Sequence, residues 1–291
     1  MDITQLCQEN RIFTTRSGSH SYGLNIAGSD EDFRGVFVGA PQNLVGLFPV
    51  EQCELGGDYV VFELRKFVTL ARDCNPNIIE LLWVDDSDIL LETPFWTRIK
   101  AHRDWFLSRR AKFTFSGYAT AQLKKIRGHN RWLREPQPVE APLPAKYLRR
   151  KHIHGLGERE VFDEAAYDAA HKNWKHYWEW KANRNPARAA LEEAHGFDSK
   201  HAMHMIRLLR MATEILRGDG VRVRRDDREE LLAIRRGEIA FEELVAQADE
   251  LQRQLDDLYP QSSLPHAPDT AKINQLMVEI YRDFWHQNAA W

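Results

Sequence analysis

Residues 17–38 read SGSHSYGLNIAGSDEDFRGVFV, and this stretch holds the strongest structural signals in the chain. Gly18 permits backbone torsions that turn main-chain N–H groups toward an anion, and Ser19 adds a hydroxyl donor. Twelve residues after Gly18, the carboxylates of Asp30 and Asp32 stand two apart at the start of an apolar run. Residues two apart on an extended strand leave the same face, so the pattern predicts two carboxylates side by side.

A pair of adjacent carboxylates favours a bound cation. The two charges repel one another unless a cation lies between them, and oxygen ligands on one face suit Mg²⁺ carried on triphosphate oxygens. Arg34 falls on the same face, where its guanidinium would pair with a carboxylate or with a phosphate oxygen. On spacing alone, the alternative is an ordinary acidic turn leading into a strand.

The first part of the chain has the pattern of a mixed α/β domain. Short β-type runs predict strands over residues 12–15, 33–38 and 59–62, and helical periodicity predicts a helix over 63–72. We therefore expect a domain over residues 1–105 in which helices flank a mixed sheet.

The remainder of the chain, residues 106–291, is rich in Ala, Leu, Arg, Glu and Lys and predicts a helical domain. Helices are expected over 200–213 and 269–291, and the second of these would pack on the body or form a dimer contact. The four prolines within residues 135–144 predict a loop. The expected fold class is therefore α+β.

Composition narrows the class of protein. Of 291 residues, 43% are hydrophobic and 29% are charged, which argues against a disordered or membrane-embedded chain. No apolar run of about 18 residues stands out, so we expect a cytoplasmic protein with no membrane partner. The net charge of -3 excludes a general polyanion binder and leaves nucleic-acid binding to local patches. Cys7, Cys53 and Cys74 form no CxxC pair and are expected to be buried free thiols.

Gly18-Ser19 followed by SDEDFRG at residues 29–35 resembles the Gly-Ser…Asp-x-Asp signature of polymerase β type nucleotidyltransferases. Arg34-Gly35 at the end of this motif is similar to the motif of one bacterial and phage branch, the RNA repair pathway polymerase β family. The resemblance extends from about residue 15 to about residue 285. Further matching segments are LRKF at 64–67, NPNIIELL at 75–82, KHAMH at 200–204 and RLL at 207–209.

The resemblance implies a polymerase β-like fold and a two-metal site. Asp30, Asp32 and a third carboxylate would hold Mg²⁺ or Mn²⁺, and Gly18 and Ser19 would hold the phosphates of an NTP substrate. Asp58 matches the third carboxylate best by position. Glu63 is the second candidate, with a helix-start acid as its ordinary interpretation.

Two groups of basic side chains are further binding candidates. Lys200, His204 and Arg207 are spaced to share one helical side, where they would grip phosphate or form a solvated face. The resemblance favours nucleotide binding by Lys200, His204 and Arg207. The candidates for nucleic-acid contact are Lys124, Lys125, Arg127, Trp174 and Lys175. Lysines at a helix end, and an aromatic stripe packed in a core, are the respective alternatives.

The predicted function is transfer of a nucleotide from an NTP to a hydroxyl, with release of pyrophosphate. The resemblance implies an RNA end as the acceptor, in repair or processing. The alternatives are nucleotidylation of a protein or a small molecule, and a nucleotide sensor without catalysis.

Overall fold

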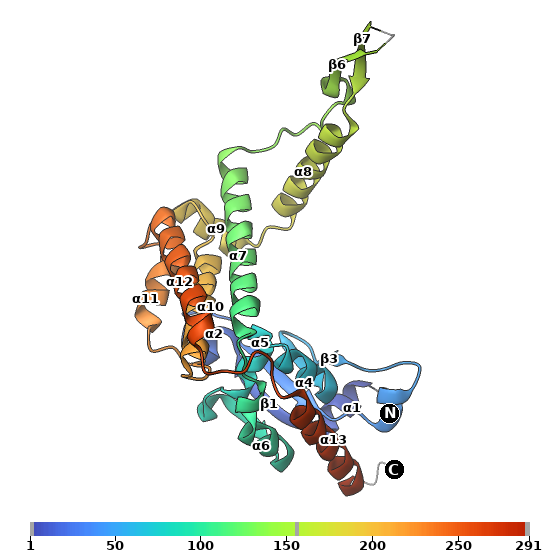
Figure 1. Cartoon of the computed structure of the whole chain (residues 1–291), viewed down its shortest axis with the longest axis vertical. Coiled ribbons are helices and arrows are strands. Elements are labelled where there is room, and N and C mark those ends of the chain that lie inside the picture. The colour runs from blue at the N-terminus through green and yellow to red at the C-terminus, as the bar shows by residue number, and fades with distance from the viewer. Residues whose placement is uncertain (1–2, 155–156, 289–291) are drawn as a thin grey trace. The chain divides into compact units, whose positions relative to one another are not determined.

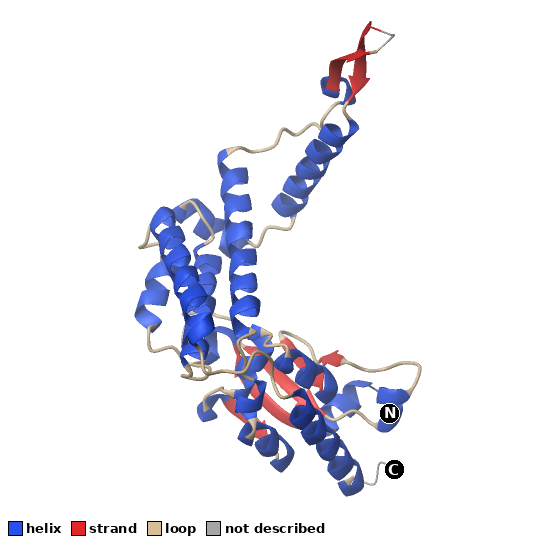
Figure 2. Ribbon diagram, in the orientation of Figure 1, coloured by secondary structure: helices blue, strands red, loops and turns tan. Residues whose placement is uncertain are grey.

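The computed structural model describes residues 3–154 and 157–288 (Figures 1 and 2). The chain divides into two compact units, Met1–Gln122 with Met203–Trp291, and Leu123–Ala202. The boundaries fall within α7 (Ala111–Arg134) and α10 (Ser199–Arg217). None of the described helices has the length and apolarity that a membrane crossing requires.

The first unit is built around a five-stranded mixed sheet in the order β3-β4-β2-β1-β5. β2 and β4 run parallel, and the other neighbouring strands are antiparallel. The predicted strands and the helix after β4 are confirmed, whereas β3 and β5, with three and four residues, are too short for a strand pattern to be recognised. The strands are β1 (Arg11–Ser17), β2 (Asp32–Phe37), β3 (Gln52–Glu54), β4 (Tyr59–Glu63) and β5 (Ile89–Glu92).

Helices surround this sheet and complete the predicted α+β fold. Before α7 lie α1 (Ile3–Glu9), α2 (Gly18–Ser21), α3 (Pro41–Val45), α4 (Leu64–Arg72), α5 (Pro76–Ile79) and α6 (Pro94–Ala101), with 3-10 turns at Glu80–Leu82, Asp86–Asp88 and Arg103–Phe106. After α10 come α11 (Arg228–Arg235), α12 (Phe241–Gln261) and α13 (Thr270–Gln287).

An aromatic core fixes α4 and α6 on one face of the sheet. Phe13 of β1 stacks on Trp96 of α6 with ring centroids 3.9 Å apart, and Phe67 of α4 lies 5.1 Å from the same indole. All three side chains are fully buried. Truncating any of them to alanine would cost about 3–5 kcal/mol of stability.

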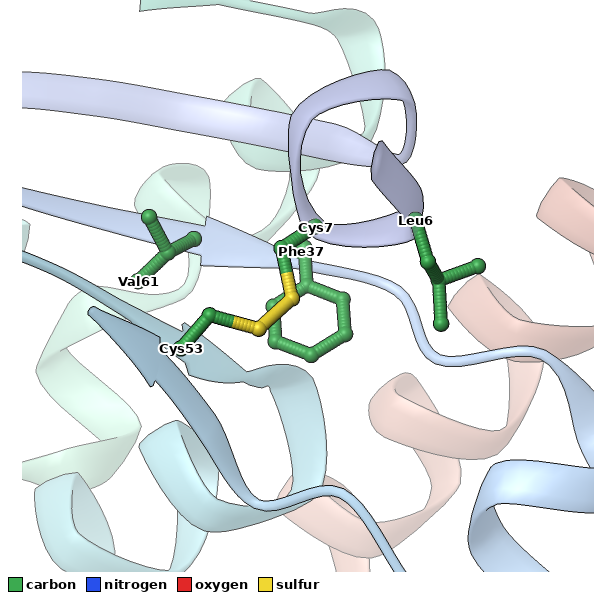
Figure 3. Packing of buried hydrophobic residues seen from close by; sticks show 5 residues of the cluster. All are labelled: Leu6, Cys7, Phe37, Cys53 and Val61. Carbon is green, nitrogen blue, oxygen red and sulfur yellow. A yellow bond between two sulfur atoms is a disulfide. The ribbon is translucent and has the colours of Figure 1, made fainter. Parts of the chain in front are cut away.

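The opposite face of the sheet packs against α1 and contains a disulfide (Figure 3). Cys7 of α1 and Cys53 of β3 are bonded, and their Cα atoms are 6.6 Å apart. The expectation of three free thiols is therefore wrong for these two residues and holds for the buried Cys74. Their separation of 46 residues along the chain concealed a pairing that depends on α1 lying over β3.

The predicted C-terminal helix forms as α13 and packs on the sheet domain. Tyr281 donates a hydrogen bond to Glu63 at 2.5 Å, and the Trp285 indole donates to the Gly39 carbonyl at 2.9 Å. Residues 289–291 of the predicted helix lie outside the described residues.

The second unit contains the end of α7, a 3-10 turn at Pro144–Tyr147, β6 (Leu148–Ile153), β7 (Gly157–Phe162), α8 (Glu164–Ala182), α9 (Pro186–His195) and the start of α10. The proline-rich segment 135–143 is a loop. Trp174 and Trp178 of α8 each donate an indole hydrogen bond of 3.0 Å to the Pro138 carbonyl.

The hairpin of β6 and β7 lies in a part of the chain for which only helices were expected. Because it is largely exposed, its sequence lacks the alternation of a half-buried strand.

Candidate functional site

A cavity of about 470 Å³ lies on one face of the main sheet, between the strands and the helices α4 and α5. The strand register pairs Ser17 with Asp32, Arg34 with Val60, and Gln52 with Phe62, and paired residues share a face. The cavity is lined by Ser17, Gly18, Tyr22, Arg34, Gln52, Val60, Phe62, Lys66, Leu70, Asn75, Asn77, Ile78 and Glu80.

Gly18 begins residues 18–24, which contain the short α2, border this cavity and are here called the glycine loop, and its backbone conformation requires glycine. Its φ of +64° lies in the left-handed region, and a Cβ at this position would collide with Oδ2 of Asp32. The Asp32 carboxylate therefore lies directly against the loop. The predicted neighbours Gly18 and Asp32 are brought together because β1 ends at Ser17, opposite the start of β2.

The loop after Gly18 is held in place by the C-terminal part of the same unit. The Arg225 backbone N–H donates to the Tyr22 carbonyl at 3.1 Å, and the Arg235 guanidinium donates to the Leu24 carbonyl at 3.0 Å. Arg228 donates to the Gly23 carbonyl. The loop that carries Ser19 is therefore anchored by arginine side chains that lie 205 and 211 residues further along the sequence from the groups they bind.

Two buried polar atoms at this loop lack partners in the described chain. They are Oγ of Ser17, which lines the cavity, and Nε2 of His20 on α2. An unsatisfied buried polar atom costs about 1–3 kcal/mol, so such atoms mark places where a polar ligand would lower the free energy. Neither residue was a candidate from sequence, because the local pattern does not show that either polar atom would be buried.

The parallel pairing of β2 and β4 places Asp58 beside Asp32. Phe33 pairs with Tyr59, so the residues immediately before them adjoin at the same sheet edge. Arg34 donates hydrogen bonds of 2.7 Å to the carbonyls of Phe33 and Asp58, which ties the two strand starts together. The Asp58 side chain is exposed.

Glu63 lies at the other end of β4, opposite Phe37. Five residues of strand separate this end from Asp32, a distance of about 16 Å. Glu63 is only 1% exposed and caps α4 by accepting from the Arg65 N–H at 2.7 Å. Burial raises the pKa of Glu63 above its ordinary value, although its hydrogen bonds oppose that shift.

Metal ligands are only partly assembled at the Asp32 edge. β2 begins at Asp32, so the exposed Asp30 precedes the strand instead of sharing its face as expected. Across residues 3–154 and 157–288, no three acidic, histidine or cysteine side chains converge as a metal site. The available oxygen donors nevertheless suit Mg²⁺, which commonly takes one or two carboxylates and fills its remaining positions with phosphate and water.

A buried ion pair stands behind the cavity. The Tyr22 hydroxyl donates to both carboxylate oxygens of Glu80, at 2.6 and 2.8 Å, and Arg207 Nη1 lies 3.7 Å from Glu80 Oε2. The Arg207 guanidinium also stacks 3.5 Å from the Tyr22 ring centroid and contacts His204 Nδ1 at 2.8 Å. Burial raises the pKa of Glu80, and the charge of Arg207 opposes the shift. Arg207 is 1% exposed, so it lies behind the wall formed by Tyr22 and Glu80 instead of in the open cavity.

The remaining candidates lie in the second unit. Lys124, Lys125 and Arg127 are exposed on α7, and Lys200 is exposed in the first turn of α10. Their binding roles stay predictions. In α8, Lys175 is exposed, whereas Trp174 is half-buried and hydrogen-bonded to the proline-rich loop, which is the packing alternative.

Polar side chains from α4 and α5 also reach the cavity, although sequence analysis assigned them no role. Lys66 Nζ is 3.0 Å from Gln52 Oε1 and 3.2 Å from Glu51 Oε2, and Asn75 and Asn77 line the same space. The motifs LRKF and NPNIIELL contain three of these residues. Nothing in those motifs indicates which side chains face a ligand.

Comparison with known proteins identifies the family. The model of RlaP, the RNA repair pathway DNA polymerase beta family, matches residues 3–279. The chain belongs to this family. It is a polymerase beta family nucleotidyltransferase linked to an RNA repair pathway, as the resemblance predicted, and the observed mixed sheet is consistent with that fold. No curated protein and no solved structure matches the chain.

RlaP membership also bears on ligands. The polymerase beta family usually uses divalent metals, and it implies an NTP substrate.

Proposed function

We propose that this RlaP protein transfers a nucleotide from an NTP to a hydroxyl group at an RNA end. The observation that supports this most directly is the cavity beside Gly18, with the Asp32 carboxylate pressed against the loop and a buried, unpaired Ser17 hydroxyl in the wall. Its volume of about 470 Å³ is in the range of small-molecule and cofactor sites.

The proposed reaction is an in-line displacement at phosphorus. The acceptor hydroxyl oxygen forms a bond to the α-phosphorus, and the bond from that phosphorus to the α,β-bridging oxygen breaks. Pyrophosphate leaves, and the hydroxyl proton passes to a carboxylate or to solvent.

Residues around the loop would bind the triphosphate. α2 begins at Gly18, so main-chain N–H groups of its first turn, together with the Ser19 hydroxyl, are available for the β- and γ-phosphates. Arg34 and Lys66 line the same cavity and would add positive charge. Lys200, His204 and Arg207 are retained as candidates for nucleotide binding. Arg207 would act through the Tyr22–Glu80 wall that it supports.

Asp30, Asp32 and Asp58 would hold Mg²⁺ or Mn²⁺, in one or two sites completed by the triphosphate. The bound metal would neutralise charge that develops on the phosphates and lower the pKa of the attacking hydroxyl. Of the two candidates for the third carboxylate, Asp58 adjoins Asp32 in the register, whereas Glu63 is buried at the far end of the strand.

The RNA acceptor is supported by the family's link to an RNA repair pathway. The exposed basic residues Lys124, Lys125, Arg127 and Lys175 are candidates for RNA contact. Because the net charge of the chain is -3, its overall charge does not attract RNA, and binding depends on such local groups. Trp174 remains a weaker candidate, since its indole N–H is already bonded to Pro138.

A labelling experiment tests this proposal. The purified protein and its Asp32→Asn variant are incubated with each α-labelled NTP, Mg²⁺ and a pool of short RNAs, and the products are separated on a denaturing gel. We expect label on RNA with the unaltered protein alone. Label on protein would overturn the RNA acceptor and support protein nucleotidylation, and absence of all transfer despite NTP binding would support a sensor.

A further inference from the structure

The hairpin formed by β6 and β7, labelled in Figure 1, distributes its charges unevenly between its two faces. In a two-stranded antiparallel ribbon, directly opposed residues share a face. On one face, Arg150 stands opposite Glu160 and His152 opposite Glu158, so each carboxylate faces a basic side chain across the strands. This is the arrangement expected of a solvated ribbon that needs no partner.

The other face of the same hairpin breaks this rule. Lys151 stands directly opposite Arg159, and Arg149 stands opposite Val161. The three cations Arg149, Lys151 and Arg159 are exposed and are here called the cationic face. Like charges directly opposed on a ribbon are destabilising, so the placement of Lys151 against Arg159 works against the free hairpin.

Neighbouring carboxylates compensate only part of this charge. Asp163, which follows β7, lies with its Oδ2 2.9 Å from Arg149 Nε. No carboxylate of β6 or β7 is opposed to a residue of the cationic face in the described register. Packing does not explain the face either, because its charged side chains are exposed and an isolated two-stranded ribbon buries little apolar surface.

We propose that the cationic face binds the phosphate backbone of the RNA acceptor. Arg149 and Lys151 are two residues apart on one strand, a spacing of about 6.6 Å that is comparable to the distance between neighbouring phosphates. A row of cations with this spacing complements a polyanion with regularly placed charges, and an RNA is the polyanion that the proposed function supplies. The choice of RNA rests on that proposed function, whereas the binding face itself rests on the hairpin register.

Salt-dependent binding to a labelled short RNA tests the proposal. The full chain is used without NTP and with a metal chelator, so the result does not depend on nucleotide transfer. The matched variants are Lys151→Gln and Arg150→Gln, which remove one positive charge from adjacent residues of the same strand but from opposite faces. The double variant Lys151→Gln/Arg159→Gln relieves the repulsion between the strands, so weaker binding by it would not reflect a destabilised hairpin.

Each lost phosphate contact on a single strand lowers the slope of log K against log salt by about 0.7. We expect a decrease of about 0.7 for Lys151→Gln, about twice that for the double variant, and none for Arg150→Gln. Equal effects of Lys151→Gln and Arg150→Gln, or an unchanged slope in the double variant, would overturn the proposal. Competition by polyglutamate as effective as that by RNA would also overturn it, in favour of an acidic protein partner.

The Asp32→Asn variant separates this inference from the proposed function. We expect it to bind RNA like the unaltered protein while it transfers no nucleotide. If the unaltered protein transfers nucleotide to RNA but the hairpin variants leave the slope unchanged, only the hairpin inference is refuted. If the hairpin variants change the slope as expected but the unaltered protein transfers no nucleotide, only the proposed function is refuted.

Discussion

The parallel strands β2 and β4 have carboxylates at both ends, and the two ends differ in their surroundings. At the start of the strands, Asp32 adjoins the glycine loop and Asp58 is exposed. At the other end, Glu63 is 1% exposed and accepts hydrogen bonds from two backbone N–H groups and from the Tyr281 hydroxyl. The second end resembles a completed structural site, whereas at the first end the Asp32 carboxylate lies against Gly18, which lines the cavity.

The difference separates structural carboxylates from those suited to a ligand. Hydrogen bonds and burial make Glu63 part of the fold, so its removal should lower stability more than catalysis. Asp32 contributes less to the core and lies beside the proposed triphosphate site, so its removal should do the reverse. Four measurements test this comparison, from the largest expected effect to the smallest.

Asp32→Asn should lower nucleotide transfer by on the order of a thousandfold, because a metal ion contributes several kcal/mol of transition-state stabilisation. The change in unfolding free energy should be small, about 0.5 kcal/mol. The measurement is the single-turnover rate with an α-labelled NTP. Glu31→Gln is the matched control, because it removes the same charge from the adjacent exposed residue and should leave the rate unchanged. Equal losses in the two variants would show a general charge effect.

Gly18→Ala should lower transfer by about ten- to a hundredfold, because the new Cβ displaces the Asp32 carboxylate and disturbs a preorganised site. Gly28→Ala is the control: Gly28 has a φ of +78°, and in the described structure no heavy atom beyond its chain neighbours lies within 4 Å of an added Cβ. Both variants pay a similar backbone strain of about 1 kcal/mol. The comparison uses transfer rates and denaturant unfolding together, and equal rates would contradict the close contact of Gly18 with Asp32.

Glu63→Gln should lower the unfolding free energy by about 1–3 kcal/mol, because its amide cannot accept both backbone N–H groups as the carboxylate does. The transfer rate per folded molecule should be retained. Urea unfolding and single-turnover rates provide the two readouts, with the exposed Glu54→Gln as a control. Loss of transfer with unchanged stability would make Glu63, and not Asp58, the third metal ligand.

The stability difference between the unaltered protein and Glu63→Gln should also depend on pH. Burial raises the pKa of Glu63 in the folded state, so the folded protein holds this proton to higher pH than the unfolded chain. The Glu63 contribution is therefore complete below the ordinary carboxyl pKa and is lost as the pH rises through the raised pKa. The expected change is about 1.4 kcal/mol for each unit by which the pKa is raised.

Unfolding free energies measured for both proteins across this pH range give the difference directly. The pKa of Glu80 is raised in the same direction, but its effect is present in both proteins and cancels. A difference that grows with pH would show that the hydrogen bonds from Tyr281, Arg65 and Gly39 outweigh burial.

Local sequence patterns predicted the elements that meet at the site. Short β-type runs identified β1, β2 and β4, and helical periodicity identified α4, whose apolar residues lie on one buried face. The family was recognisable from Gly18, Asp30 and Asp32 and from segments spread over most of the chain. The hairpin of β6 and β7 was not predicted, because its strands are largely exposed and lack the apolar alternation of a half-buried strand.

The sequence by itself determined the α+β class, the family and the identity of the residues near the glycine loop, because these depend on short-range spacing. Only the tertiary structure decided that Asp58 adjoins Asp32 while Glu63 is buried at the opposite end, since this follows from the parallel register of strands separated by more than 20 residues. It also decided the pairing of Cys7 with Cys53 and the burial of Arg207 against Tyr22 and Glu80. Contacts between distant segments depend on the packing of the whole unit, and local spacing does not encode them.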